Sequence, residues 1–204
     1  MNIDVTLIIE EGPTYEVIVE TGENLLNDIE VEVVGNQLQL SDNNSCNFVR
    51  DFGITKVYVT TPFLTEIRNS SQFEVQSQGV LTFPELKLLS EDFNEPGNFT
   101  VGDFRLEVAN NRIEVTSNNI SSFYLSGTTN NLRVGFFAGS GRFEGANLLA
   151  NNVNIYHRGS NDMIVHPMDQ LVGEIVGPGD VIAVNQPPIV DVTELYTGQL
   201  IFED

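Results

Sequence analysis

Apolar and polar residues alternate with a period of two along most of the chain. Val5, Leu7 and Ile9 share one parity, and the segment 29–40 alternates aliphatic residues with glutamate and glutamine around a Gly-Asn turn at 35–36. Alternation of this kind between glycine and asparagine breaks is typical of β-strands. Only NLLNDIE (24–30) suggests a short helical turn. The pattern therefore predicts an all-β protein.

From about residue 62 onward, turn residues return at a regular interval. Turns are marked near Gly97, Asn119, Gly139, Gly159 and Gly177. A repeat of roughly 20 residues predicts a solenoid, in which short strands of successive coils pair in parallel. Asparagine tolerates the left-handed backbone of a tight corner. We therefore expect corners at the Asn-Asn pairs, which occupy 43–44, 110–111, 118–119, 130–131 and 151–152.

Three of these turns can be aligned with one another: AGSGRFEG (138–145), RGSNDMIV (158–165) and VGPGDVIA (176–183). Because side chains alternate between the two faces of a strand, the alignment predicts columns that run from coil to coil. The expected inward columns are Phe143, Met163 and Val181, and then Gly145, Val165 and Ala183. The outward column between them is Glu144, Ile164 and Ile182.

The outward Ile164 and Ile182 suggest that their face is partly covered, either by the N-terminal strands or by a second copy of the chain in a homo-oligomer. The same alignment sets His157 beside Phe137 and Ile175, and sets His166 beside Ala146 and Val184. Two histidines without a third ligand at metal spacing do not form a zinc site. We expect both histidines to be packed or hydrogen-bonded instead.

The charge of the chain narrows the choice of partners. It has 204 residues, with 29 acidic and nine basic side chains and a formal net charge of −20. A surface this acidic repels phosphate backbones and anionic membranes, so nucleic acid is not an expected partner. No apolar run is long enough for a transmembrane helix, and the first residues lack the basic start of a signal peptide.

Cys46 is the only cysteine, which excludes an internal disulfide. Apart from Arg50 it has no basic neighbour in the sequence that could activate its thiol, so a nucleophilic role is not expected.

Asp162 and Asp180 share one aligned position with Arg142. Because paired strands lie about 4.8 Å apart, the two carboxylates would be about 5 Å from each other. Such a pair suits a retaining glycosidase or a cation site, whereas a solvated ladder that Arg142 partly neutralises needs no ligand. The sequence favours the solvated ladder, which leaves Asp162 and Asp180 as weak metal candidates. The Gly-rich turns lead into strands and not into helix N-termini, so they are not phosphate-binding loops. No catalytic residue and no cofactor are expected, because the sequence shows no active-site constellation.

Several short motifs follow one another in a recognisable order. They are an initial strand pair, NLL with a following isoleucine (24–29), GNQLQL (35–40), CNFVR (46–50), VYVTTPFLTEI (57–67) and the later Gly-Ser turns. This order resembles the putative auto-transporter adhesin, head GIN domain family over about residues 3–204, although NSS (69–71) replaces the first expected GSG. The resemblance implies a right-handed parallel β-helix-like fold in an envelope or secreted protein, and it carries over no catalytic residue.

Together, these observations predict a single domain over 1–204, with an N-terminal strand and hairpin layer (1–61) and β-solenoid coils (62–204). The expected function is that of a non-enzymatic cell-envelope module for adhesion or structural interaction. It would display polar side chains to an unknown protein or glycan surface. The alternative is a carbohydrate-binding or polysaccharide-cleaving β-helix protein. We expect export to the periplasm or outer surface, with the export signal removed from this sequence.

Overall fold

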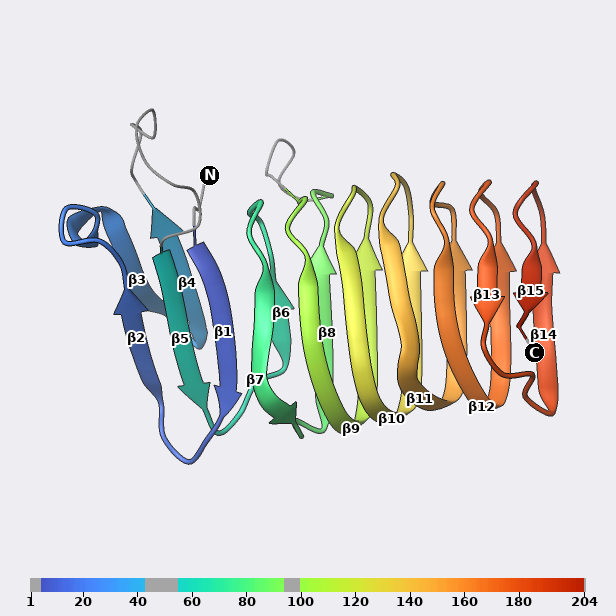
Figure 1. Ribbon diagram of the computed structural model, residues 1–204, viewed down its shortest axis with the longest axis horizontal. Coiled ribbons are helices and arrows are strands. Elements are labelled where there is room, and N and C mark those ends of the chain that lie inside the picture. The colour runs from blue at the N-terminus through green and yellow to red at the C-terminus, as the bar shows by residue number, and fades with distance from the viewer. Residues whose placement is uncertain (1–4, 43–54, 94–99, 204) are drawn as a thin grey trace.

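The protein is nearly all β: of the residues that the structure describes, 64% lie in strands and 2% in helix. The computed structural model describes residues 5–42, 55–93 and 100–203 (Figure 1). The elements are β1 (Val5–Glu11), β2 (Glu16–Glu20), η1 (Leu26–Asp28), β3 (Ile29–Val34), β4 (Gln37–Asp42), β5 (Thr55–Thr61), β6 (Glu66–Arg68), β7 (Val75–Leu81), β8 (Glu85–Ser90), β9 (Phe104–Ser117), β10 (Ser122–Phe136), β11 (Arg142–His157), β12 (Met163–Ile175), β13 (Val181–Ala183), β14 (Ile189–Glu194) and β15 (Leu200–Phe202). The single short helical turn expected within 24–30 is confirmed as η1.

The predicted parallel β-solenoid is confirmed, and it has about seven turns. Strands β9 to β12 are 13 to 16 residues long, and each runs along one side of the solenoid, bends, and returns along the other (Figure 1). We call the two sides the first arm and the second arm. In β9, for example, they are residues 104–108 and 113–117. Strands β7 and β8 pair with the first and second arm of β9, respectively, and β13 and β14 pair in the same way with β12.

The N-terminal strands extend the first arm. β1 lies between β7 and β5 and is parallel to both, and β2 closes this end as an antiparallel neighbour of β5. β3 and β4 form a separate hairpin. The N-terminal strands therefore stack on the end of the coils instead of covering a face of them. Since Ile164 and Ile182 lie toward the other end of the stack, these strands do not cover them, and that expected alternative was wrong.

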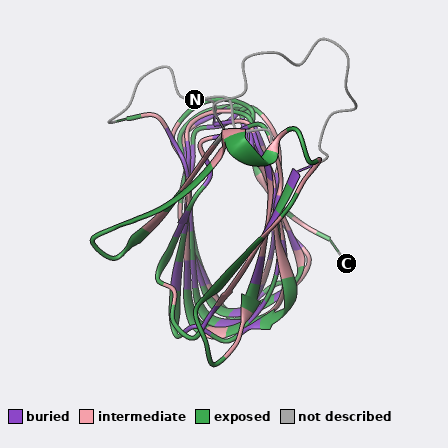
Figure 2. Ribbon diagram, turned by 90° about the vertical axis from the view of Figure 1, so that its left-hand side faces the viewer, coloured by how far each residue is buried: buried purple, intermediate pink, exposed green. Residues whose placement is uncertain are grey.

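Buried residues alternate with more exposed ones along both arms (Figure 2). On the first arm, Phe104 and Phe123 stack with ring centroids 4.8 Å apart, and Phe143 continues the same column. The predicted column from Phe143 through Met163 to Val181 is confirmed, as is the outward column from Glu144 to Ile182. All five residues of the inward column are fully buried, which removes large apolar surfaces from water.

The Gly-rich turns are corners of successive coils, as the alignment predicts. The N–H of Ser160 donates to the carbonyl of Gly139 at 2.9 Å, and that of Gly179 donates to Gly159 at 3.1 Å. Gly139 has a φ of +81°, and a Cβ at this position would lie 2.1 Å from the carbonyl oxygen of Asn119 in the coil before it. Glycine is therefore required here both by the backbone conformation and by the close approach of the next coil.

The prediction of left-handed corners at the Asn-Asn pairs was wrong. Pairs 110–111, 130–131 and 151–152 lie inside β9, β10 and β11, and no described residue other than glycine has a positive φ. The bend needs no left-handed residue, because consecutive side chains simply both point outward there while the backbone stays extended. Pair 118–119 lies in the turn before β10, and pair 43–44 and Gly97 lie outside the described residues.

The alignment was also wrong by one residue for His157, which pairs with Phe136 and not with Phe137. The offset between β10 and β11 is 20 residues at Ser122 and Arg142 (142 − 122) but 21 at Ser126 and Asn147 (147 − 126). A register shift between Tyr124 and Ser126 accommodates one extra residue in β11. Uniform spacing in the sequence therefore fails beyond this irregularity.

Replacing Gly139 by alanine is expected to lower the free energy of unfolding by about 2 kcal/mol or more, since the new Cβ must displace the neighbouring coil and adopt a positive φ. Gly35→Ala is the matched control, because Gly35 also has a positive φ (65°) but a Cβ there has no atom within 4 Å. The control should lose only about 1 kcal/mol. Urea unfolding measures both values, and equal losses would contradict the steric role of coil stacking.

Candidate functional site

The bends of β9, β10 and β11 carry what we call the asparagine ladder, formed by the exposed residues Asn111, Asn130, Asn131, Asn151 and Asn152. The Nδ2 of Asn151 donates to Oδ1 of Asn130, and the Nδ2 of Asn130 donates to Oδ1 of Asn111, both at 3.1 Å. Asn131 and Asn152 donate to the backbone carbonyls of Asn111 and Asn130, at 3.2 and 3.3 Å. The amides therefore point the same way along the solenoid, and their dipoles reinforce one another.

A groove of about 670 Å³ runs beside the asparagine ladder on the second arm. Leu132 and Val153 contribute to its lining between two rows of outward side chains. The polar lining residues are Arg112, Asn131, Arg133, Asn152, Asn154 and Gln170. None of the described residues that line the groove is acidic, although the chain carries a net charge of −20.

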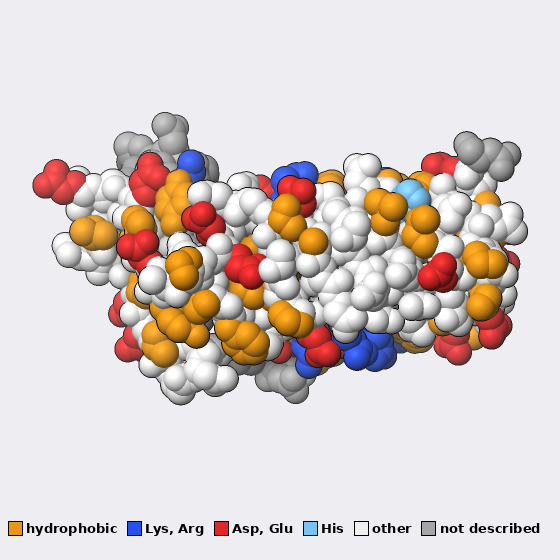
Figure 3. All heavy atoms as spheres, turned by 90° about the horizontal axis from the view of Figure 1, so that it is seen from below, with side chains coloured by type: hydrophobic (Ala, Val, Ile, Leu, Met, Phe, Trp, Pro, Cys, Tyr) orange, Lys and Arg blue, Asp and Glu red, His pale blue; other side chains and the backbone are white. Residues whose placement is uncertain are grey.

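The two arginines of the groove are weakly paired. A guanidinium nitrogen of Arg133 lies 3.7 Å from the carboxylate of Glu114, which is longer than a hydrogen bond. Arg112 stands next to Glu85 in the strand register, but no ion pair joins them in the described structure. Figure 3, which views the molecule from the side of the bends, shows a band of uncharged side chains over the middle coils with basic side chains gathered along one border.

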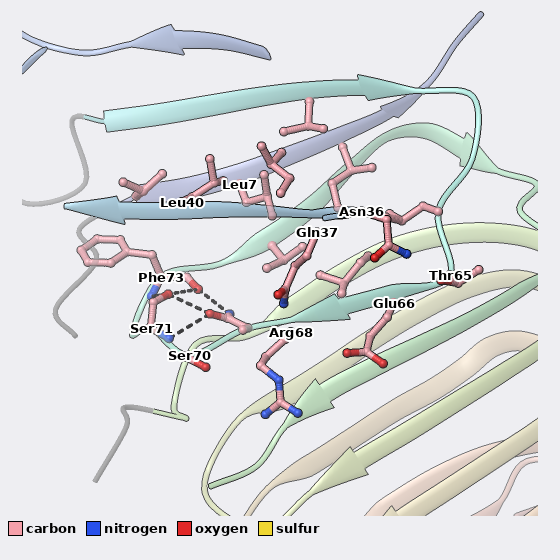
Figure 4. A pocket seen from close by; sticks show the side chains of 18 residues that line it. Leu7, Asn36, Gln37, Leu40, Thr65, Glu66, Arg68, Ser70, Ser71 and Phe73 are labelled. Atoms are coloured by element: carbon pink, nitrogen blue, oxygen red, sulfur yellow. Dashed lines mark hydrogen bonds between the residues drawn. The ribbon is translucent and has the colours of Figure 1, made fainter. Parts of the chain in front are cut away.

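A second cavity, of about 460 Å³, lies at the N-terminal end of the solenoid (Figure 4). We call it the N-terminal cleft. It arises because β1 and β5 extend the first arm, whereas the second arm begins only at β6. The hairpin β3–β4 lies opposite the unmatched strands. The apolar lining residues are Val5, Leu7, Ile9, Leu38, Leu40, Val59, Leu64, Ile67, Phe73 and Val75.

Polar groups at one side of the N-terminal cleft are already occupied within the chain. The Oγ of Ser71 donates to Oδ1 of Asn69 at 2.8 Å, and the Nδ2 of Asn69 donates to the carbonyl of Phe73 at 2.8 Å (Figure 4). The guanidinium of Arg68 points away from the hairpin and pairs with Glu91 at 2.6 Å. The NSS segment thus forms a coil corner held by its own side chains, and ten of the 18 residues that line the cleft are apolar.

The structure brings together two of the three charged residues that share an aligned position. A guanidinium nitrogen of Arg142 lies 3.5 Å from Asp162, and its Nε lies 2.5 Å from Glu144. The hydrogen bond with Glu144 raises the pKa of Arg142 further above its usual value. Asp180 instead accepts the backbone N–H of Gln199 at 2.8 Å. In the described ranges, no three histidine, cysteine or acidic residues gather closely enough to hold a metal ion.

The histidines occupy different environments. His166 Nδ1 lies 2.8 Å from the carbonyl oxygen of Ala146, so this histidine is hydrogen-bonded, as expected. His157 is fully buried, its ring lies 5.9 Å from that of Phe136, and neither ring nitrogen makes a hydrogen bond of normal geometry. Burial lowers the pKa of His157, and the backbone of Asn161 opposes this effect in part. Cys46 lies outside the described residues.

Sequence reasoning anticipated a display of polar side chains on the coils, but it missed the groove and the N-terminal cleft. The signal for the asparagine ladder was the return of Asn-Asn pairs at the coil period. The N-terminal cleft left no comparable signal, because it depends on β1 pairing with both β5 and β7 across long stretches of sequence.

A family model described as "putative auto-transporter adhesin, head GIN domain" matches residues 1–187. No protein of curated function matches the chain. Within the described ranges, no helix is both long enough and apolar enough to span a bilayer.

Several solved structures have a similar fold. A putative adhesin from Bacteroides fragilis is 21% identical, with a TM-score of 0.84 over 100% of this chain and 93% of that one. A putative lipid binding protein from Parabacteroides distasonis is 15% identical, with a TM-score of 0.61 over 98% and 93%. A putative adhesin from Parabacteroides merdae is 15% identical, with a TM-score of 0.54 over 100% and 93%. At these identities the likeness shows the fold alone.

His157→Leu is expected to become more stabilising as the pH falls. The unfolded chain takes up a proton on His157 below about pH 6.5, whereas burial keeps the folded side chain neutral, so the wild-type protein loses stability as the pH falls from 6.5 towards the lowered pKa of the folded state. The leucine variant lacks this loss. Urea unfolding at pH 8 and pH 5 should show its advantage over wild type growing by about 1 kcal/mol at the lower pH. A difference that does not change with pH would contradict the buried, neutral histidine.

Proposed function

The chain belongs to the putative auto-transporter adhesin, head GIN domain family, and on this basis we propose that it is a non-enzymatic module of the cell envelope that binds a glycan surface. The observation that carries the proposal is the asparagine ladder on the bends of the coils. The ladder is exposed and repeats at the coil spacing. The parallel strands beneath it hold it rigid.

The chemistry of the asparagine ladder suits hydroxyl-rich ligands. An amide side chain offers two donors and one acceptor, so it can bond a sugar hydroxyl in either sense. Within the ladder, the internal bonds fix the direction of each amide. At its two ends, Nδ2 of Asn111 and Oδ1 of Asn151 have no partner among the described residues. Preorganised groups lose little conformational entropy on binding. Uncharged amides also do not repel an anionic ligand, whereas the acidic side chains on the rest of the surface would.

The alternative of polysaccharide cleavage receives little support from the carboxylates. A retaining mechanism needs one free carboxylate and one protonated carboxyl facing the same bond. Here Arg142 pairs with Asp162, and Asp180 accepts a backbone hydrogen bond from the next coil. We therefore propose that these side chains hold the coil starts together and have no catalytic role.

The N-terminal cleft supports a second candidate function, the binding of an apolar ligand such as a fatty acyl chain. Apolar residues, including three from β1 and two from β4, make up ten of its 18 lining residues, and its volume of about 460 Å³ falls within the usual range for small-molecule sites. One structural neighbour is described as a putative lipid binding protein, although its low identity supports only the fold. This candidate rests on the cleft itself.

For glycan binding, the double variant Asn130→Ala, Asn151→Ala is expected to weaken binding to immobilised oligosaccharides by about tenfold, because it removes the side-chain hydrogen bonds that join Asn111, Asn130 and Asn151. Surface plasmon resonance on a panel of neutral oligosaccharides measures the change. Asn161→Ala is the matched control, since Asn161 lies at the opposite, Gly-rich corner of a coil. Equal binding by the double variant and wild type, with unchanged melting temperatures, would contradict the proposal.

For the N-terminal cleft, Leu38→Asp is expected to lower the binding of a fluorescent fatty acid by at least about tenfold, since a carboxylate then enters an apolar lining. Val33→Asp is the matched control, because Val33 pairs with Leu38 across the hairpin but is 72% exposed and does not line the cleft. Fluorescence titration measures both variants. If the two lose affinity equally, or if wild type shows no binding, the second candidate is wrong.

A further inference from the structure

We propose that the groove beside the asparagine ladder binds oligosaccharides that carry a single carboxylate, with Arg112 and Arg133 holding the carboxylate and the amides holding the hydroxyls. This inference rests on the proposed glycan-binding function and deepens it, because it names the class of sugar and the residues that select it. It concerns the second arm of β9 to β12.

The groove runs across the strands and therefore along the solenoid. In the strand register, Arg112 is followed by Asn131, Asn152 and Gln170, one residue from each successive coil. At about 4.8 Å per coil, this row extends for about 14 Å. A parallel row runs from Arg133 to Asn154, two residues further along each strand. The groove is thus long enough for a short oligosaccharide, with both guanidinium groups at its N-terminal end.

Most of the polar groups in the groove are free to bind a ligand. The side chains of Arg112, Asn154 and Gln170 make no hydrogen bond or ion pair within the described parts of the chain. Arg133 has only the 3.7 Å contact with Glu114, and exposed pairs of this kind contribute little. A guanidinium group presents five N–H donors in a planar fork that matches a carboxylate. A ligand carboxylate can therefore displace the weak contact without leaving a buried charge.

The charge of the whole molecule limits how acidic the ligand can be. A chain with a net charge of −20 repels polyanions at long range, while the two arginines provide a favourable site only locally. One carboxylate on an otherwise neutral sugar chain gains the local attraction and suffers little of the general repulsion. Nucleic acids and densely charged polysaccharides do not meet this condition.

The test compares 3′-sialyllactose with lactose, which differ by one carboxylated sugar, by saturation-transfer NMR and calorimetric titration on the full chain. We expect 3′-sialyllactose to bind about tenfold more tightly than lactose. The variant Arg112→Gln, Arg133→Gln should bind both sugars equally. Raising the salt concentration should weaken binding of 3′-sialyllactose to wild type but not to this variant, because exposed charges are screened.

Arg105→Gln is the matched control, since it removes one positive charge from the first arm, where Arg105 pairs with Glu74 at 2.8 Å and stacks on Tyr124. It should keep the preference for 3′-sialyllactose. If lactose binds as tightly as 3′-sialyllactose and the groove variant behaves as wild type, the inference is wrong while glycan binding stands. Tighter binding of polygalacturonate than of 3′-sialyllactose would also overturn it. If neither sugar binds, the proposed function fails as well.

Discussion

Parallel pairing between successive coils is the constraint on which the rest of this structure depends. Each strand of a coil completes its backbone hydrogen bonds only with the coil before and the coil after it, so the register between coils is fixed residue by residue. Side chains at equivalent positions are then stacked about 4.8 Å apart along the whole molecule. Each side chain in such a column must therefore pack favourably against the equivalent side chain of the next coil. Phenylalanines meet this condition inside by stacking, and asparagines meet it outside by bonding amide to amide.

Charged residues meet the same condition by alternating in sign. One outward column of the second arm reads Glu66, Lys87, Glu114 and Arg133 in successive coils. Cross-strand pairs of opposite charge are mildly favourable, whereas like charges directly opposite are destabilising. A chain with 29 acidic and nine basic residues cannot alternate everywhere. Uncharged amides instead occupy the bends of the middle coils, where a column of like charges would be destabilising, and this surface carries few charged side chains (Figure 3).

The sequence predicts the fold correctly where equivalent residues of successive coils are evenly spaced along the chain. The column from Phe143 to Val181 follows directly from the alignment of the Gly-rich turns. It lies just after these turns, and the register shift between β11 and β12 begins only after Glu144. The prediction for His157 was wrong by one residue, because the extra residue in β11 is invisible to a fixed period. The Asn-Asn pairs do repeat at the coil period, as predicted, but they do not adopt a left-handed backbone. Asparagine tolerates that conformation better than most residues, but this tolerance does not mean that a given asparagine adopts it. The N-terminal cleft was out of reach, because it depends on β1 entering the stack between β5 and β7.

The groove shows how the stacking constraint can create a site. The column that alternates in charge from Glu66 ends at Arg133, because the next residues in it, Asn154 and Val172, are uncharged. A guanidinium group at the end of such a row has a carboxylate on one side only. On its other side it faces amides, which offer hydrogen bonds without cancelling its charge. Arg112 ends its own row in the same way, with Glu85 before it and Asn131 after it. Because screening limits electrostatic effects to about 8–10 Å at moderate salt, recognition in the groove depends on these two row ends, while the net charge governs which ligands approach.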